Sequence, residues 1–64
     1  MKDWQQRVIT ERDELCAKLS KLRQFKQTAE YAAAESKARS LLDQQDCVMQ
    51  QYADILGARI ALFK

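Results

Sequence analysis

The sequence contains no proline and no histidine, and its single glycine, Gly57, lies near the C-terminal end. The two cysteines, Cys16 and Cys47, are too few for a disulfide framework, and without histidine they do not make up the four ligands of a structural zinc site. No glycine-rich phosphate loop, nucleophile elbow or metalloprotease motif is present. We therefore interpret the cysteines as free thiols, and we expect no enzyme, no metal and no cofactor.

Long apolar runs and an excess of one charge are also missing. No stretch approaches the roughly 18 apolar residues of a membrane span, and the opening MKDWQQR has no apolar run of the kind found in a secretory signal. Charged residues make up 31% of the chain but leave a net charge of only +2, so the totals indicate no strong attraction to nucleic acid or membrane. We expect an intracellular protein that binds no membrane and no small molecule.

The chain has only 64 residues, which limits it to one domain. Chains of this size bury little surface, and they usually depend on disulfides, a metal or a second copy for stability. Because the first two are not expected, the size predicts a homodimer.

The second half of the chain has the clearest periodic pattern, in which pairs of apolar residues recur every seven residues. The pairs are Leu41-Leu42, Val48-Met49, Ile55-Leu56 and Leu62-Phe63. On a helix this spacing gives one wide apolar face, of the kind that packs along other helices in the coiled-coil manner. The face is wider than a two-residue seam, so it is expected to meet more than one neighbour.

The first half has its own apolar stripe, in which Val8, Leu15 and Leu22 repeat at seven. Continued through the middle, this repeat would fall on Ala29, Ser36 and Asp43, so the two stripes are out of register by roughly 100°. The mismatch predicts a break between residues 26 and 34, with β-branched Thr28 as the local disruptor. A continuous rod is the alternative, because AEYAAAES is good helix material.

These patterns predict a mainly α fold with one domain over residues 1–64, in which a helix at about 3–25 and a helix at about 35–62 form a hairpin that homodimerises. A short extended strand in the connection at about 26–34, paired across the dimer, is considered as well. The orientation of the two subunits and the exact place of the break stay open. The predicted dimer and core residues are Val8, Leu15, Leu19, Leu22, Phe25, Tyr31, Leu41, Val48, Tyr52, Ile55 and Leu62. The candidate surface for another partner consists of Trp4, Met49, Leu56 and Phe63.

The spacing Phe25-x-x-Thr28-x-x-Tyr31 is followed by further packing residues at Leu41-Leu42, Gln45, Met49, Tyr52, Ile55-Leu56 and Arg59-Ile60. Together with the opening MKDWQQRVITERDELCAKLSKLRQF, this pattern resembles a family of small early proteins of temperate phages. Their genes lie between the exonuclease and excisionase genes of lambda and of Shiga-toxin phages. The resemblance covers essentially the whole chain, and its motif consists of packing residues without a catalytic signature.

The resemblance implies an early accessory protein that favours lytic development in the host bacterial cytoplasm, with a dimeric fold of two helices and a short strand. The leading hypothesis is therefore a non-enzymatic protein that binds a host or phage regulatory factor. The alternative is a weak nucleic-acid-binding regulator of transcription or replication. Binding to nucleic acid would rely on the basic cluster of the first half, which consists of Lys18, Lys21, Arg23 and Lys26. Because these residues spread around the helix, we interpret them as a solvated surface and do not expect nucleic acid as a partner.

Overall fold

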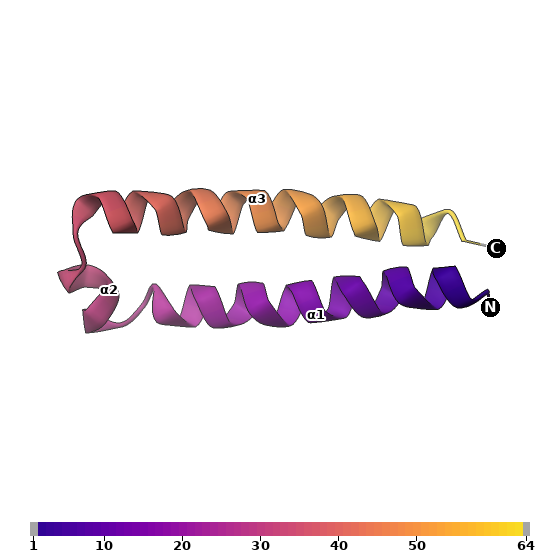
Figure 1. Cartoon of the computed structure of the whole chain (residues 1–64), viewed down its shortest axis with the longest axis horizontal. Helices are drawn as coiled ribbons and strands as arrows, with labels where there is room; N and C mark the ends of the chain where they lie inside the picture. Colours follow the sequence, from indigo (N-terminus) through magenta and orange to yellow (C-terminus); the bar gives the residue numbers. More distant parts are fainter. Residues whose placement is uncertain (1, 64) are drawn as a thin grey trace.

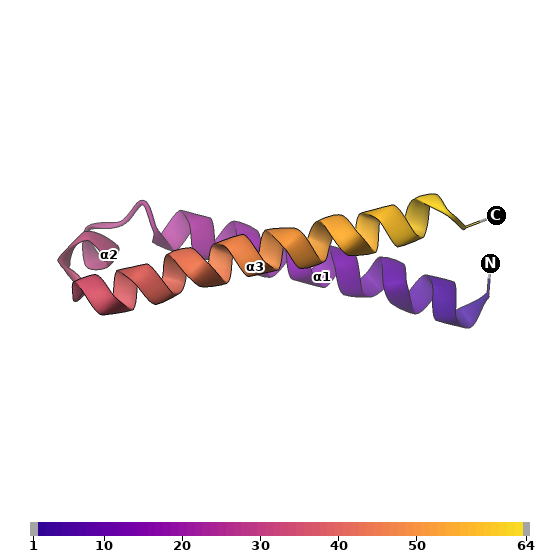
Figure 2. The ribbon, with the colours of Figure 1, turned by 90° about the horizontal axis from the view of Figure 1, so that it is seen from above.

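The computed structural model describes residues 2–63, and within them the chain forms helices α1 (Asp3–Phe25), α2 (Ala29–Ala33) and α3 (Ser36–Ala61). The long helices α1 and α3 lie side by side and run in opposite directions, so both ends of the chain lie at the same end of the molecule (Figure 1). Seen from above, α3 crosses α1 at a shallow angle (Figure 2). The molecule measures 47 × 15 × 13 Å. It is a mainly helical hairpin and not a continuous rod.

The ends of the long helices carry residues that suit the helix dipole. Asp3 stands in the first turn of α1, while Arg23 and Arg59 stand in the last turns of α1 and α3. Negative charge near a helix N-terminus and positive charge near its C-terminus are favourable. The side chain of Gln5 also accepts a hydrogen bond from the backbone N–H of Lys2 at 3.1 Å, which satisfies a donor just before α1 begins.

Thr28 makes the turn possible without proline or glycine. Its hydroxyl donates to the carbonyl oxygen of Phe25 at 2.6 Å and accepts from the backbone N–H of Tyr31 at 3.3 Å. One side chain thus binds the last turn of α1 and caps the first turn of α2. The chain then leaves α2 through extended backbone at Ala34 and Glu35, and no residue from 2 to 63 has a positive φ.

The predicted strand in the connection is wrong: residues 29–33 form the helix α2, and residues 2–63 contain no strand. The strand was expected because an isolated extended segment would leave its backbone groups unpaired. In the structure these groups bond locally. The N–H of Ala32 donates to the carbonyl oxygen of Thr28 at 3.3 Å, and that of Ala34 donates to Tyr31 at 3.2 Å. The connection therefore needs no second chain to satisfy its backbone.

The hairpin core is thin. Among the described residues, the buried hydrophobic side chains are Val8, Leu19, Ala53 and Leu56, and only Leu56 is completely shielded from solvent. Full burial of an aliphatic side chain contributes about 1.5–3 kcal/mol, so this core is small for ordering two helices of more than twenty residues each. Most of the apolar surface that the sequence supplies lies elsewhere on the hairpin.

Candidate protein-binding face

The apolar pairs of α3, and the pair Leu62-Phe63 that directly follows it, are split between two environments. The second member of each pair turns toward α1: Leu56 is buried, and Leu42, Met49 and Phe63 are half-buried. The first members remain in solvent, and their exposed fractions are 55% for Leu41, 62% for Val48, 58% for Ile55 and 78% for Leu62. The seven-residue repeat therefore supplies two rows, of which the hairpin itself covers only one.

A row of residues on α1 lies on the same side of the hairpin as the exposed row of α3. Its members, spaced by seven, are Trp4, Glu11, Lys18 and Phe25, and all four are exposed. Residues seven apart stay within about 20° of each other around a helix. The hydroxyl of Tyr52 donates to the carboxylate of Glu11, and Tyr52 lies beside Val48 and Ile55 on α3 because residues three and four apart are neighbours. We call this surface the open face, and it consists of Trp4, Glu11, Lys18, Phe25, Leu41, Val48, Tyr52, Ile55 and Leu62.

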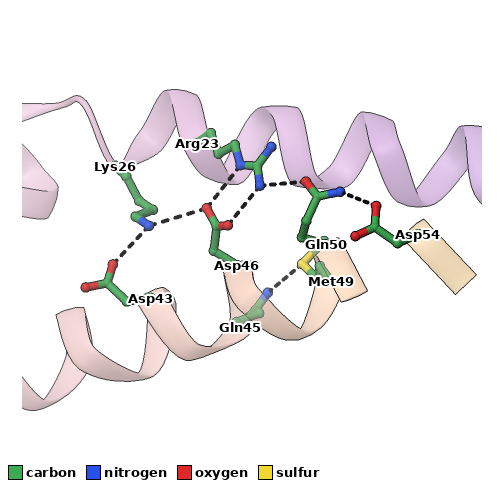
Figure 3. Close-up of polar contacts among 8 residues, drawn as sticks. All are labelled: Arg23, Lys26, Asp43, Gln45, Asp46, Met49, Gln50 and Asp54. Carbon is green, nitrogen blue, oxygen red and sulfur yellow. Dashed lines mark hydrogen bonds and ion pairs between the residues drawn. The ribbon is translucent and has the colours of Figure 1, made fainter. Parts of the chain in front are cut away.

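The opposite side of the hairpin is closed by polar contacts, which Figure 3 shows. Arg23 of α1 donates to both carboxylate oxygens of Asp46, at 3.0 and 3.2 Å, and to Oε1 of Gln50 at 2.9 Å. Gln50 in turn donates to Asp54 at 2.8 Å. Lys26 pairs with Asp43 at 3.0 Å and with Asp46 at 3.3 Å. We call Arg23, Lys26, Asp43, Asp46, Gln50 and Asp54 the polar clasp.

The polar clasp lies away from the open face because of helical geometry. Asp46 and Gln50 each stand two residues from Val48, which is a rotation of about 200° around α3 at about 100° per residue. The two sides of the hairpin therefore differ in kind. One side is held together by interhelical charge pairs, and the other presents side chains that are mostly apolar.

Contacts in the polar clasp shift the ionisation of Arg23, Lys26, Asp43 and Asp46 toward the charged forms. The hydrogen bond from Arg23 lowers the pKa of the Asp46 carboxyl, and the same bond raises the pKa of Arg23. Hydrogen bonds from Tyr31 and Lys26 lower the pKa of Asp43, and the bond to Asp43 raises the pKa of Lys26. Two of the four basic residues considered for nucleic-acid binding thus have carboxylate partners within the hairpin.

Tyr31 ties the connection to α3. Its hydroxyl donates to Oδ1 of Asp43 at 2.6 Å, and this bond raises the pKa of the tyrosine. Its ring also packs edge-to-face on Phe25, with centroids 6.3 Å apart. Tyr31 therefore fixes α2 against the end of the hairpin.

The predicted dimer and core residues divide into two groups in the structure. Val8 and Leu19 are buried between the helices, and Leu15, Leu22 and Tyr31 are half-buried. The others lie on the open face of the single chain: Phe25, Leu41, Val48, Tyr52, Ile55 and Leu62. Their assignment to a dimer interface stays a prediction, and their exposure leaves them available for one.

The candidate surface for another partner is not brought together as predicted. Leu56 has no exposed surface and belongs to the core, because it points toward α1 beside buried Ala53. Met49 is half-buried on the same side of α3. Trp4, in contrast, packs edge-to-face on Phe63 with centroids 5.2 Å apart and remains 50% exposed. Of the four residues, only Trp4 is exposed, and Phe63 is half-buried against it.

The polar clasp was not predicted from the sequence, although the charge pattern contained a signal for it. Arg23 and Asp46 are equally distant in sequence from the turn, and so are Lys26 and Asp43. Opposite charges at such mirrored positions meet when a chain folds back on itself. These pairs can be recognised from the sequence only when the centre of the turn is known, and it lies a few residues beyond Thr28.

The described residues offer little for other kinds of site. Among residues 2–63, no cluster of three or more His, Cys, Asp or Glu side chains could hold a metal ion. No helix in that part of the chain has the length and hydrophobicity needed to cross a membrane. Cys16 and Cys47 are both free and exposed. A shallow hollow beside the polar clasp is lined by Cys16, Leu19, Arg23 and Gln50, among others.

Comparison with known proteins places the chain in a family. No curated protein and no solved structure matches the chain significantly. The model of the Sequestin family matches residues 2–62, which is nearly the full length. The chain therefore belongs to the Sequestin family.

Proposed function

We propose that this protein is a non-enzymatic phage accessory protein that acts as a homodimer and promotes lytic development by holding a host or phage regulatory protein. The open face is the observation that carries this proposal. Five aliphatic or aromatic side chains on α3 and its C-cap are exposed on one side of a hairpin whose own core is thin: Leu41, Val48, Tyr52, Ile55 and Leu62. Contiguous apolar surface of this kind marks a protein–protein contact in small soluble proteins.

The family name supports a protein that holds another molecule, since Sequestin denotes sequestration. The resemblance to early proteins of lambdoid phages supports a role in the lytic pathway. A small domain without catalytic machinery of its own exerts such an effect by occupying a surface of another protein. Phe63 is our candidate contact for the regulatory partner, because it is a partly exposed aromatic residue outside the open face that the second copy covers, and aromatic residues are enriched at protein interfaces.

Nucleic-acid binding finds little support in the site. Affinity for nucleic acid requires several unpaired basic side chains on one surface. Arg23 and Lys26 are engaged with Asp43 and Asp46, which leaves Lys18 and Lys21 of the cluster on α1. Lys18 shares its row with Glu11. We therefore place protein binding ahead of nucleic-acid binding.

The proposal is tested with a pair of substitutions at neighbouring positions. Val48→Asp places a charge on the open face without entering the hairpin core, whereas Cys47→Asp places the same charge about 100° further around α3. By sedimentation equilibrium, we expect the parent and Cys47→Asp to have twice the 7.5 kDa mass of the chain and Val48→Asp to have the single mass. Circular dichroism should show that all three are helical.

The same variants are then expressed in lysogenic bacteria, and the phage yield after induction is measured. We expect the parent and Cys47→Asp to raise the yield and Val48→Asp to lose the effect. A Val48→Asp protein that is dimeric and as active as the parent would contradict the proposal. If Val48→Asp were unfolded, the milder Ile55→Ser variant would replace it, with the same expected loss.

A further inference from the structure

The two rows of the open face run along the same length of the hairpin. At one end, Trp4 packs on Phe63, the neighbour of Leu62. Near the middle, Glu11 accepts a hydrogen bond from Tyr52, which lies between Val48 and Ile55. At the other end, Lys26, the neighbour of Phe25, pairs with Asp43 near Leu41. The α1 row and the α3 row therefore begin and end together, and they share a midpoint.

Each row also complements its own reversed copy. The α3 row is Leu41, Val48, Ile55 and Leu62, and every member is aliphatic. The α1 row has aromatic rings at both ends, Trp4 and Phe25, and between them one acid and one base, Glu11 and Lys18. When the α1 row is reversed, rings meet rings and the acid meets the base. A two-fold symmetric interface requires this kind of self-complementarity, because the same patch must fit itself.

We propose that two copies pair open face to open face about a two-fold axis that is perpendicular to the helices and passes through the shared midpoint. The inference rests on the homodimer of the proposed function and specifies its orientation. In this arrangement α3 lies antiparallel to α3 of the partner subunit, and α1 lies antiparallel to the partner's α1. Leu41 then comes level with Leu62 of the partner subunit, and Val48 with Ile55 of the partner subunit. The result is a four-helix bundle with an aliphatic seam.

The charges on α1 select this arrangement over the other symmetric one. Here Glu11 of one subunit comes level with Lys18 of the other, which makes two equivalent ion pairs. If the two-fold axis instead ran along the helices, α1 would cover the partner's α3. Glu11 and Lys18 would then lie against the aliphatic row that contains Ile55 and Val48. Placing unpaired charges against apolar side chains is costly, whereas paired charges at the edge of a bundle are tolerated.

The self-complementarity also explains why a second copy is the occupant of this face. A foreign helix would need a base opposite Glu11 and an acid opposite Lys18 at a spacing of seven, with large apolar residues alongside. The chain itself provides this pattern in reverse order. The exposed aliphatic row would be covered at the same time, which completes the core that the single hairpin lacks.

Disulfide trapping tests the orientation. In a Cys16→Ser, Cys47→Ser background, three proteins are prepared: Val48→Cys, Ile55→Cys, and the double variant that carries both. In the proposed pair, the two copies of residue 48 are offset by seven residues along the helices, or about 10.5 Å, and so are the two copies of residue 55. This is too far for a disulfide, which needs Cα atoms within about 7 Å. With oxidised glutathione, we expect the double variant to form covalent dimers at least tenfold faster than either single variant. A mixture of the two single variants should form only the mixed species.

Three outcomes would contradict the proposed orientation, and one of them would also contradict the homodimer on which it rests. Fast covalent dimers from Val48→Cys alone would show that the two α3 helices are parallel. A dimer by sedimentation in which none of the variants is trapped would show that α3 does not face its own copy. In both cases the homodimer of the proposed function survives. A protein that sediments as a monomer at all concentrations would remove the homodimer itself, and the orientation with it.

Discussion

The polar clasp and the open face lie on the same two helices, yet a single chain pairs the charges of the clasp and leaves the apolar side chains of the open face uncovered. The clasp is complete within one copy, since each of its charged residues finds a partner at 3.3 Å or less on the facing helix or beside it. The open face is incomplete, because its aliphatic row remains more than half exposed. The contrast indicates that the charge pairs help to align the two helices of one hairpin, whereas the exposed aliphatic row is available for the proposed association.

Two adjacent residues on α3 give the largest expected difference. Leu56→Ala removes the one completely buried side chain and should lower the free energy of unfolding by about 2–5 kcal/mol. Ile55→Ala changes a side chain that is exposed in the single hairpin, so it should weaken association instead. Thermal unfolding at several protein concentrations separates the two effects. Equal losses for both variants at high dilution would erase the distinction between core and open face.

The charge pattern of the α1 row predicts a preference between chains. Glu11→Lys gives a row with two positive residues, and Lys18→Glu gives a row with two negative residues. Each variant should self-associate more weakly than the parent, while an equal mixture should form a heterodimer roughly tenfold tighter than either variant alone, given two exposed pairs of up to about 1 kcal/mol each. Native mass spectrometry of the mixture measures this. A statistical distribution of species would show that the α1 rows do not face each other.

Gly57 allows a stabilising change that leaves both sides of the hairpin intact. It stands inside α3, and a Cβ atom added there would meet nothing within 4 Å. Gly57→Ala should therefore raise the free energy of unfolding by about 0.5–1 kcal/mol, through helix propensity alone. Chemical denaturation measures the gain. A change in the sedimentation equilibrium of this variant would mean that Gly57 lies closer to the interface than the open face places it.

Acid should loosen the polar clasp, and we expect this effect to be the smallest, since exposed ion pairs contribute little. The pKa values of Asp43 and Asp46 are lowered in the folded chain. Their stabilisation is therefore fully present above the ordinary aspartate pKa of about 3.9, and it is lost as the pH falls from there through the folded values. Asp46→Asn should flatten this part of the pH dependence of the thermal midpoint. A profile identical to that of the parent would show that the clasp contributes nothing measurable.

The periodic pattern predicted much of the architecture. A spacing of seven in both halves, with stripes out of register, was enough to expect two helices folded back near Thr28. The pattern did not decide which member of each apolar pair faces α1, because both members are apolar and adjacent. Packing makes that choice, and small Ala53 beside Leu56 lets the two helices approach on that side.

The connection was predicted less well for a local reason. Thr28 was recognised as a disruptor of the helix, but its hydroxyl also acts as a cap, and this turns the following residues into α2. Helix propensity in AEYAA was therefore a better guide than the lack of glycine. The family match confirms the type of protein at the level of the family only, and the pairing of two copies is a proposal that periodicity and charge support.

Both ends of the chain lie at one end of a hairpin 47 Å long. In an antiparallel pair, anything attached to the ends is therefore carried at opposite poles. Fluorophores joined near residue 2 of each copy would be separated by nearly the full length of the particle, so energy transfer between them would be weaker than in a parallel pair, where they would lie side by side. By the same geometry, two regulatory partners held under the proposed function at Phe63 of each copy would bind at opposite poles of the pair and would stay apart from each other.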